Sequence, residues 1–172
     1  IPMRSRFDFK AAKMLAELCR TLDIDLIHTH YLRENYIAML AKSYNPKPAV
    51  VYTSHFVMTN DWITRLSNRL LSHRQDRVIA VCNCGKDQLI KNGLDGKKIE
   101  VVFNAVDPGL WAEPIESTLR EELSLKDSCF VMLCASRFAH DKGHEYLIRS
   151  IARLKELTKH EFRLVLAGDG EL

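Results

Sequence analysis

The fold of this chain is decided by fifteen consecutive residues, which read Cys129-Phe130-Val131-Met132-Leu133-Cys134-Ala135-Ser136-Arg137-Phe138-Ala139-His140-Asp141-Lys142-Gly143. The first seven form an apolar run, which is typical of a strand buried on both faces of a parallel sheet. A polar loop follows, and from Gly143 to Leu157 the apolar residues recur at helical spacing. A second apolar run spans residues 162–167. The order strand, loop, helix, strand predicts a βαβ unit.

The same alternation of helix and strand fills the chain before this unit. Helices are expected over 9–23, 34–42, 62–75 and 84–92, and strands over 25–30, 49–54, 77–82 and 99–103. Asp8 is a suitable N-cap for the first helix. The sequence therefore predicts an α/β fold with Rossmann-like parallel sheets.

The domain boundary is expected where this alternation stops. Residues 104–114 contain two Pro and one Gly and show no period, and residues 117–125 read as a short polar helix. We therefore expect one domain over 1–107, a linker over 108–127 and a second domain over 128–172. One βαβ unit cannot cover both faces of its own sheet, and the chain begins with Ile1. Both domains are expected to be incomplete, and the chain to be a fragment.

The composition is that of a globular protein. The chain has 172 residues, 25 Lys and Arg, 22 Asp and Glu and 47% hydrophobic residues, which excludes a disordered or collagen-like chain. No apolar stretch reaches the roughly 18 residues of a membrane span, and residues 1–10 do not read as a signal peptide. The five Cys are therefore expected to be reduced thiols. These features predict a cytoplasmic protein.

The charge is unevenly distributed. Residues 1–107 carry 16 basic and 11 acidic side chains, a net charge of +5, whereas residues 108–172 carry 9 and 11, a net charge of −2. In the helix expected over 62–75, Arg65, Arg69 and Arg74 interleave with apolar residues and form a cationic edge. This pattern fits an ordinary solvated helix, or a peripheral membrane contact with anionic lipid or an anionic acceptor. A net charge of only +3, without interleaved aromatic residues, argues against nucleic acid.

The loop after the strand at 129–135 is the best candidate ligand site. Ligands of open α/β sheets bind at the carboxyl ends of strands. Arg137 and Lys142 lie in this loop, and the helix that follows offers free N–H groups at its N-terminus. A phosphate is the expected ligand of such a loop, although the two cations could equally face water.

The loop resembles the Gly-Arg-Leu-x-x-x-Lys-Gly signature that opens the C-terminal domain of retaining GT-B glycosyltransferases of the group 1 (family four) type. Further segments are similar to this family's pattern in the expected order: Asp25 to His30, Val51 to His55, Arg77 to Cys82, Ile99 to Asp107 and Leu164 to Gly170. The resemblance runs from about residue 23 to the last residue. It implies a two-domain GT-B architecture and the use of a nucleotide sugar.

The resemblance also implies an activity. Such enzymes transfer a sugar from a nucleoside-diphosphate sugar to an acceptor hydroxyl with retained configuration, as in cell-envelope polysaccharide, glycolipid or small-thiol glycoside biosynthesis. A hexosyltransferase that needs no cofactor or bound metal is implied here, with an unidentified acceptor.

The resemblance assigns roles to individual residues. Arg137 and Lys142 match the pair that binds the donor diphosphate in this family. The two cations would neutralise the negative charge of the leaving group. His55 matches the histidine that contacts the transferring sugar, although a lone His after a strand is often structural. Residues expected to line the cleft are His30, Asn104, Gly168, Asp169 and Gly170. For the two glycines the alternative is a tight turn, and His28 is expected to be a hydrogen-bonded core residue.

The sequence departs from the family pattern at three positions. Ala105 and Ser136 stand where Gly is usual, and Cys82 stands where Ser is usual. The glycine-rich acceptor loop near the family's N-terminus and the Glu-x7-Glu stretch late in its C-terminal domain have no counterpart in the sequence. We therefore expect the isolated fragment to be inactive.

Three rival interpretations remain open at this point. A metal site built from Cys82, Cys84, His28, His30, His140 or His144 lacks zinc-finger spacing. A non-catalytic Rossmann-like binding module would be expected to show a Gly-x-Gly-x-x-Gly loop, which does not occur. A truncated pseudoenzyme would act through its surface.

Overall fold

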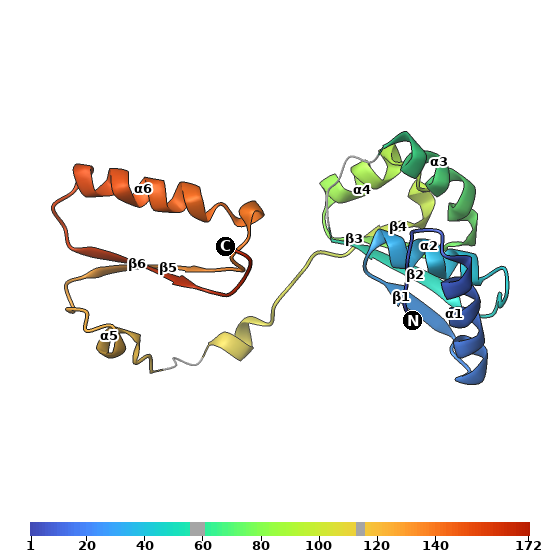
Figure 1. Ribbon diagram of the computed structural model, residues 1–172, viewed down its shortest axis with the longest axis horizontal. Coiled ribbons are helices and arrows are strands. Elements are labelled where there is room, and N and C mark those ends of the chain that lie inside the picture. Colours follow the sequence, from blue (N-terminus) through green and yellow to red (C-terminus); the bar gives the residue numbers. More distant parts are fainter. Residues whose placement is uncertain (56–60, 113–115) are drawn as a thin grey trace. The chain divides into compact units, whose positions relative to one another are not determined.

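The computed structural model describes residues 1–55, 61–112 and 116–172. Contacts divide the chain into two units, Ile1–Asp107 and Pro108–Leu172. Each unit contains a parallel sheet with helices packed on it (Figure 1). The chain is an α/β protein, as the alternation of helix and strand predicts.

Helices and strands alternate through the first unit. Its elements are α1 (Phe9–Thr21), β1 (Leu26–Thr29), α2 (Leu32–Ala41), β2 (Ala49–Ser54), α3 (Trp62–Leu71), η1 (Ser72–Arg74), β3 (Arg77–Ala80), α4 (Asn83–Lys91), η2 (Gly96–Lys98) and β4 (Ile99–Val101). The strands pair in parallel in the order β1-β2-β3-β4. Because they run in the same direction, their carboxyl ends share one edge of the sheet, where ligands of such sheets bind.

Helices α1 and α2 build much of the core of this unit. The Asp8 carboxylate accepts a hydrogen bond from Ala11 N at 3.0 Å, which confirms Asp8 as the N-cap of α1. The buried residues Ala11, Ala12 and Ala16 pack against α2, where their small side chains allow close helix packing. No helix in the described parts of the chain is long and apolar enough to cross a membrane.

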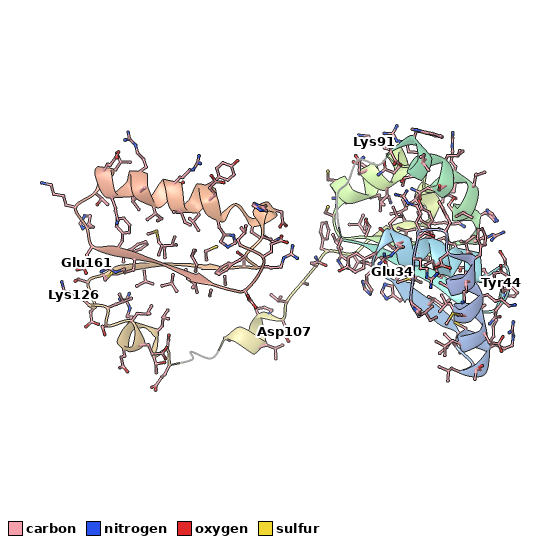
Figure 2. The ribbon with its side chains drawn as sticks, viewed as in Figure 1. Glu34, Tyr44, Lys91, Asp107, Lys126 and Glu161 are labelled. Carbon is pink, nitrogen blue, oxygen red and sulfur yellow. The ribbon has the colours of Figure 1, made fainter. Side chains whose placement is uncertain are left out.

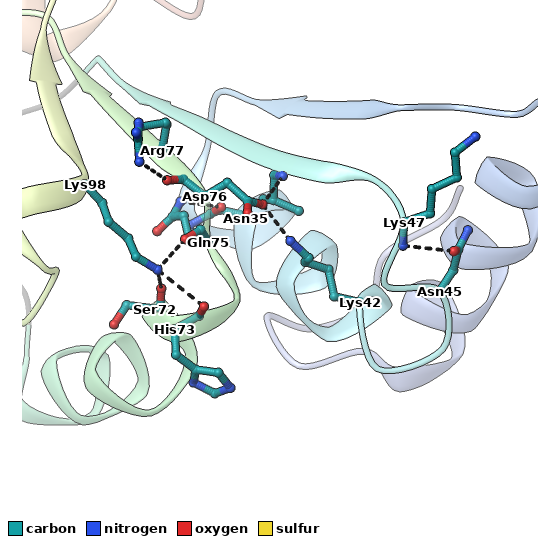
Figure 3. Close-up of polar contacts among 11 residues, drawn as sticks. Asn35, Lys42, Asn45, Lys47, Ser72, His73, Gln75, Asp76, Arg77 and Lys98 are labelled. Carbon is teal, nitrogen blue, oxygen red and sulfur yellow. Dashed lines mark hydrogen bonds and ion pairs between the residues drawn. The ribbon is translucent and has the colours of Figure 1, made fainter.

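A polar network ties η1 to the surrounding elements (Figure 3). Lys98 Nζ donates to the carbonyl oxygens of Ser72, His73 and Gln75 at 3.0, 3.3 and 2.6 Å. The next residue, Asp76, accepts from Lys42 Nζ at 2.6 Å and from Val50 N at 2.7 Å. These bonds fix the segment between α3 and β3 against the end of α2, against β2 and against η2.

Helix α3 buries polar side chains and exposes apolar ones. Asn68 is only 1% exposed; it accepts from Tyr36 Oη at 2.7 Å and donates to the carbonyl oxygen of Asn92 at 2.7 Å. Burial raises the pKa of Tyr36 to about 12, which keeps the hydroxyl protonated as the donor. Buried Thr64 accepts from Arg6 at 3.0 Å. Of the apolar residues that the sequence indicates on this helix, Ile63, Leu66 and Leu70 are exposed and Leu71 is half-buried; Trp62 is exposed as well.

Some elements of the first unit end earlier than the sequence predicts. Helix α3 stops at Leu71, so Arg74 lies in η1, where its guanidinium donates to Ser43 Oγ. Arg74 therefore does not continue the α3 edge formed by Arg65 and Arg69. Strand β3 stops at Ala80, and Cys82 is not in the strand: it caps α4, with Sγ accepting from Gly85 N at 3.3 Å.

The second unit is built around one βαβ element. Its elements are η3 (Pro108–Trp111), α5 (Leu119–Glu122), β5 (Phe130–Ala135), η4 (His140–Lys142), α6 (His144–Leu157) and β6 (Phe162–Ala167). Strands β5 and β6 pair in parallel, and α6 lies along one face of the pair (Figure 1). Of the helix positions expected to point inward, Leu147, Ile151 and Leu154 are half-buried, but Ile148 is 54% exposed.

The segment before β5 is fastened to this unit. Arg120 Nη1 donates to the carbonyl oxygens of Lys126 and Cys129, both at 3.1 Å. Lys126 and Glu161 form an ion pair at 3.1 Å (Figure 2). The described residues between Pro108 and Asp127 thus belong to the compact second unit.

Candidate functional site

The loop between β5 and α6 holds Arg137 and Lys142 on either side of one carboxylate. Asp141 Oδ1 lies 3.5 Å from the Arg137 guanidinium and Asp141 Oδ2 lies 3.3 Å from Lys142 Nζ. The hydrogen bond from Lys142, with the charges of both cations, holds the pKa of Asp141 below its usual value. Both cations are exposed, so an incoming anion can reach them. Asp141 occupies the position between them that a ligand anion would otherwise fill.

The loop ends at a helix start that requires glycine. Gly143 has a φ of +70° and is the N-cap of α6, a conformation that L-residues with a side chain rarely adopt. Because this kink begins α6 directly after Lys142, the positive end of the helix dipole lies beside the cationic pair. The local chemistry favours an anion, and a phosphate can accept from both cations and from free backbone N–H groups.

Ser136 and His144 fasten the two ends of the loop together. Ser136 Oγ and His144 Nε2 are 3.0 Å apart, and the Phe138 ring meets the His144 ring edge-on with centroids 5.0 Å apart. His144 is only 7% exposed. The sequence suggests only a metal-ligand role for His144. Its spacing of eight residues from Ser136 carries no recognisable signal until the loop folds back.

The backbone at Gly168 and Gly170 lies very close to the backbone of this loop at Ser136 and Phe138. Ser136 N donates to Ala167 O at 3.0 Å, and Phe138 N donates to Asp169 O at 2.9 Å. A Cβ on Gly168 would lie 2.0 Å from the carbonyl oxygen of Ser136, and one on Gly170 would lie 2.1 Å from that of Phe138. Neither glycine has a positive φ, so close approach explains them better than a tight turn.

A second group of candidate residues lies in the first unit, at the carboxyl ends of β1 and β2. His30 Nδ1 and His55 Nε2 are 2.9 Å apart, and their rings stack with centroids 5.2 Å apart. His28 Nε2 lies 2.8 Å from Thr53 Oγ1. His28 is hydrogen-bonded as expected, but it is exposed and does not belong to the core.

Two neighbouring imidazoles, those of His30 and His55, affect the pKa of His28. The pKa of His28 lies below its usual value because its ring is partly desolvated and because His30 and His55 disfavour another positive charge. A hydrogen bond between two ring nitrogens needs one donor and one acceptor, so both nitrogens of the His30–His55 contact cannot carry protons.

A cavity of about 570 Å³ opens beside His30. Its lining is more apolar than polar, and the polar side chains in it include Arg6, His30, Ser54, Asp61 and Asn68. Asn104 is exposed in the irregular segment that follows β4. His30 and His55 belong to the first unit, whereas Arg137, Lys142 and the Gly168–Gly170 segment belong to the second. In residues 1–55, 61–112 and 116–172, no three His, Cys, Asp or Glu side chains are arranged to hold a metal ion.

Two parallel-sheet units, with a cationic loop at a strand end in the second, agree with the GT-B class of glycosyltransferase fold. Residues 1–110 match the family model described as Glycosyltransferase Family 4, and residues 115–172 match that described as Glycosyl transferases group 1. The chain belongs to the glycosyltransferases described by these two models, Glycosyltransferase Family 4 in its first part and Glycosyl transferases group 1 in its second.

Individual relatives agree with this assignment. The chain is 30% identical over 167 residues to N-acetylgalactosamine-N,N'-diacetylbacillosaminyl-diphospho-undecaprenol 4-alpha-N-acetylgalactosaminyltransferase of Campylobacter jejuni, covering 91% of this chain and 42% of that protein. A glycosyltransferase from Rickettsia africae has a similar fold, with a TM-score of 0.77 at 22% identity, over 98% of this chain and 46% of that one. The Anabaena protein HepE, solved in complex with UDP, gives a TM-score of 0.73 at 20% identity over 94% and 44%. The chain thus spans less than half of these proteins.

Proposed function

We propose that the complete protein transfers a sugar from a nucleoside-diphosphate sugar to an acceptor hydroxyl with retention of configuration. The observation that carries this proposal is the loop in which Arg137 and Lys142 flank Asp141 at the N-terminus of α6. HepE, which shares the fold, was solved with UDP, which supports a uridine nucleotide as the donor.

The loop would act on the leaving group. As the bond between sugar and diphosphate breaks, negative charge grows on the leaving phosphate oxygen. The Arg137 guanidinium can bind that phosphate in a bidentate manner, and the Lys142 ammonium adds a compact charge. Both cations would exchange Asp141 for the diphosphate. They supply the positive charge themselves, so this step needs no bound metal or cofactor. Interactions that strengthen as charge develops lower the barrier.

His55 is proposed to act at the sugar. Its Nε2 faces His30, so its Nδ1 is the ring nitrogen that remains for a substrate hydroxyl. A neutral imidazole can donate or accept a hydrogen bond there without adding a charge. His30, Asn104, Gly168, Asp169 and Gly170 would line the site, with the two glycines allowing the backbone of β6 to lie close to the loop.

We also propose that the protein works at the cytoplasmic face of a membrane, on a lipid-linked or glycolipid acceptor. The Campylobacter relative is named for a diphospho-undecaprenol acceptor. Helix α3 presents exposed Trp62, Leu66 and Leu70 beside Arg65 and Arg69, an arrangement typical of interfacial helices.

The test is the rate of sugar transfer by the complete protein with Lys142→Ala. Removing one group that stabilises developing charge lowers the rate on the order of 10²–10³-fold. Lys126→Ala is a matched control, because Lys126 pairs with Glu161 away from the loop. An unchanged rate in Lys142→Ala would reject the phosphate role. Proton NMR of the product's anomeric centre tests retention, which an inverted product would contradict.

A further inference from the structure

Three basic side chains from two helices surround one hollow of the first unit. Arg65 and Arg69 lie one turn apart on α3, and Lys91 is the last residue of α4 (Figure 2). They line a hollow of about 460 Å³. The sequence grouped Arg65 and Arg69 with Arg74, but Arg74 is bonded to Ser43 and does not line this hollow. Lys91 replaces Arg74 as the third cation.

Close helix packing brings Lys91 to the arginines. Gly93, with a φ of +90°, follows α4, and a Cβ at this position would lie 2.7 Å from the carbonyl oxygen of Arg65. Only a residue without a side chain allows the end of α4 to approach α3 so closely. The fold therefore sets the backbone positions from which Arg65 and Lys91 project.

Basic side chains outnumber acidic ones in the lining of this hollow. Within the described residues, Arg65, Arg69 and Lys91 form no ion pair. Asp95 also lines the hollow; its carboxylate accepts a hydrogen bond from Lys97 N at 3.0 Å and offsets one of the three positive charges. Like charges one turn apart destabilise a helix slightly. A bound anion would relieve this repulsion, and guanidinium groups match the geometry of a phosphate.

The surface beside the hollow is apolar. At 100° per residue, Trp62, Ile63, Leu66 and Leu70 fall within one arc of roughly 100°, and all four side chains are exposed, Trp62 by 72% and Leu70 by 63%. Arg65 and Arg69 border this arc on one side. A ligand that meets both features must carry a phosphate next to hydrocarbon, which is the chemistry of a phospholipid at a membrane surface.

We propose that the hollow formed by Arg65, Arg69 and Lys91 binds the phosphate of a membrane phospholipid while the apolar arc of α3 enters the bilayer interface. This inference rests on the membrane contact proposed above and names its phosphate site. The hollow lies in the first unit, apart from the Arg137 and Lys142 loop of the second. Its failure would leave nucleotide-sugar binding untouched.

Co-sedimentation of the chain with lipid vesicles tests the proposal. The wild type is expected to bind vesicles of phosphatidylcholine mixed with phosphatidylglycerol, and to bind pure phosphatidylcholine much less. A basic residue near an anionic surface changes the partition coefficient about fivefold. Lys91→Gln should therefore lower partitioning about fivefold and Arg65→Gln with Arg69→Gln about 25-fold. Leu66→Ser with Leu70→Ser should weaken binding to both kinds of vesicle.

Arg74→Gln is the matched control, because it removes the same charge from the same region outside the hollow. It should change partitioning less than twofold. An effect of Arg74→Gln equal to that of Lys91→Gln would show that diffuse charge suffices, and would overturn the hollow while leaving the membrane contact in place.

Other outcomes would overturn the proposal differently. No binding to any vesicle would reject both the hollow as a lipid site and the membrane contact. Tight, Lys91-dependent binding of inorganic pyrophosphate without vesicle binding would make a soluble phosphate compound the ligand. A dimer in sedimentation velocity that dissociates in Leu66→Ser with Leu70→Ser would assign the apolar arc to a second copy of the chain. Because Arg65, Leu66, Arg69, Leu70 and Lys91 are exposed and Arg74 is half-buried at the surface, circular dichroism should be unchanged in each variant.

Discussion

Replacing Gly168 by Ala tests whether the candidate phosphate loop is held by close backbone packing. The new Cβ would lie 2.0 Å from the carbonyl oxygen of Ser136, about 1.4 Å short of an ordinary 3.4 Å contact. The atom it meets belongs to the backbone, so no side-chain rotation can relieve the overlap. The segments that contain Ser136 and Gly168 must therefore separate.

The expected cost follows from the two hydrogen bonds that flank Gly168. Ser136 N donates to Ala167 O at 3.0 Å and Phe138 N to Asp169 O at 2.9 Å. Separation by about an ångström would lengthen both bonds beyond hydrogen-bonding distance. At about 1 kcal/mol for each bond, the loss is about 2 kcal/mol. Amide hydrogen exchange should then be roughly 30-fold faster at Ser136 and Phe138, since 1.4 kcal/mol is a tenfold change.

Gly96→Ala is the control for this experiment. A Cβ on Gly96 would meet the end of the flexible Ile90 side chain at 3.1 Å, and the φ of Gly96 is not positive. This variant should exchange like the wild type. Unchanged protection of Ser136 and Phe138 in Gly168→Ala would refute the close packing and, with it, the reason given for this glycine.

Two further predictions concern the network of Figure 3. Asp76→Asn should lower the free energy of unfolding by about 1 kcal/mol at neutral pH. Desolvation raises the pKa of Asp76, but the hydrogen bonds from Lys42 and Val50 outweigh this effect and hold the pKa below its usual value. This stabilisation is present above the ordinary aspartate pKa of about 4 and is lost as the pH falls through the lower pKa of the folded state. Denaturant unfolding curves of the wild type and the variant should therefore converge in acid. A constant difference in free energy at every pH would contradict this. Lys98→Met should lower the free energy of unfolding by about 1–2 kcal/mol, because three carbonyl oxygens lose their donor. Lys97→Met, at the exposed neighbouring position, should lower it by almost nothing in the same assay. Equal losses in the two variants would contradict the assigned bonds.

Local sequence signals account for most of the elements. The Asp8 cap, the apolar run at 130–135 and the β-branched run at 49–54 each lie where the sequence predicts. These signals are local because capping and the alternation of apolar runs with helical periods depend on neighbouring residues. The same reasoning overextends β3 to Cys82, because apolar residues alone cannot show where the chain turns into α4.

Features that depend on distant residues could not be read from the sequence. Helix α3 buries Asn68 because Tyr36 and Asn92, which are 32 and 24 residues away, satisfy its amide group. Lys91 joins Arg65 through the approach at Gly93. The contact between Ser136 and His144 likewise arises when the loop folds back. Each depends on tertiary packing that no local period encodes.

The central claim is that the loop from Ser136 to His144 binds a nucleoside diphosphate. Titration of the ¹⁵N-labelled chain with UDP, followed by backbone amide NMR, tests it most directly. The largest shifts are predicted at the amides of residues 136–144, and Arg137→Ala with Lys142→Ala should abolish them while leaving the first unit's spectrum unchanged. Shifts that are absent from this loop, or that persist in the double variant, would contradict the claim.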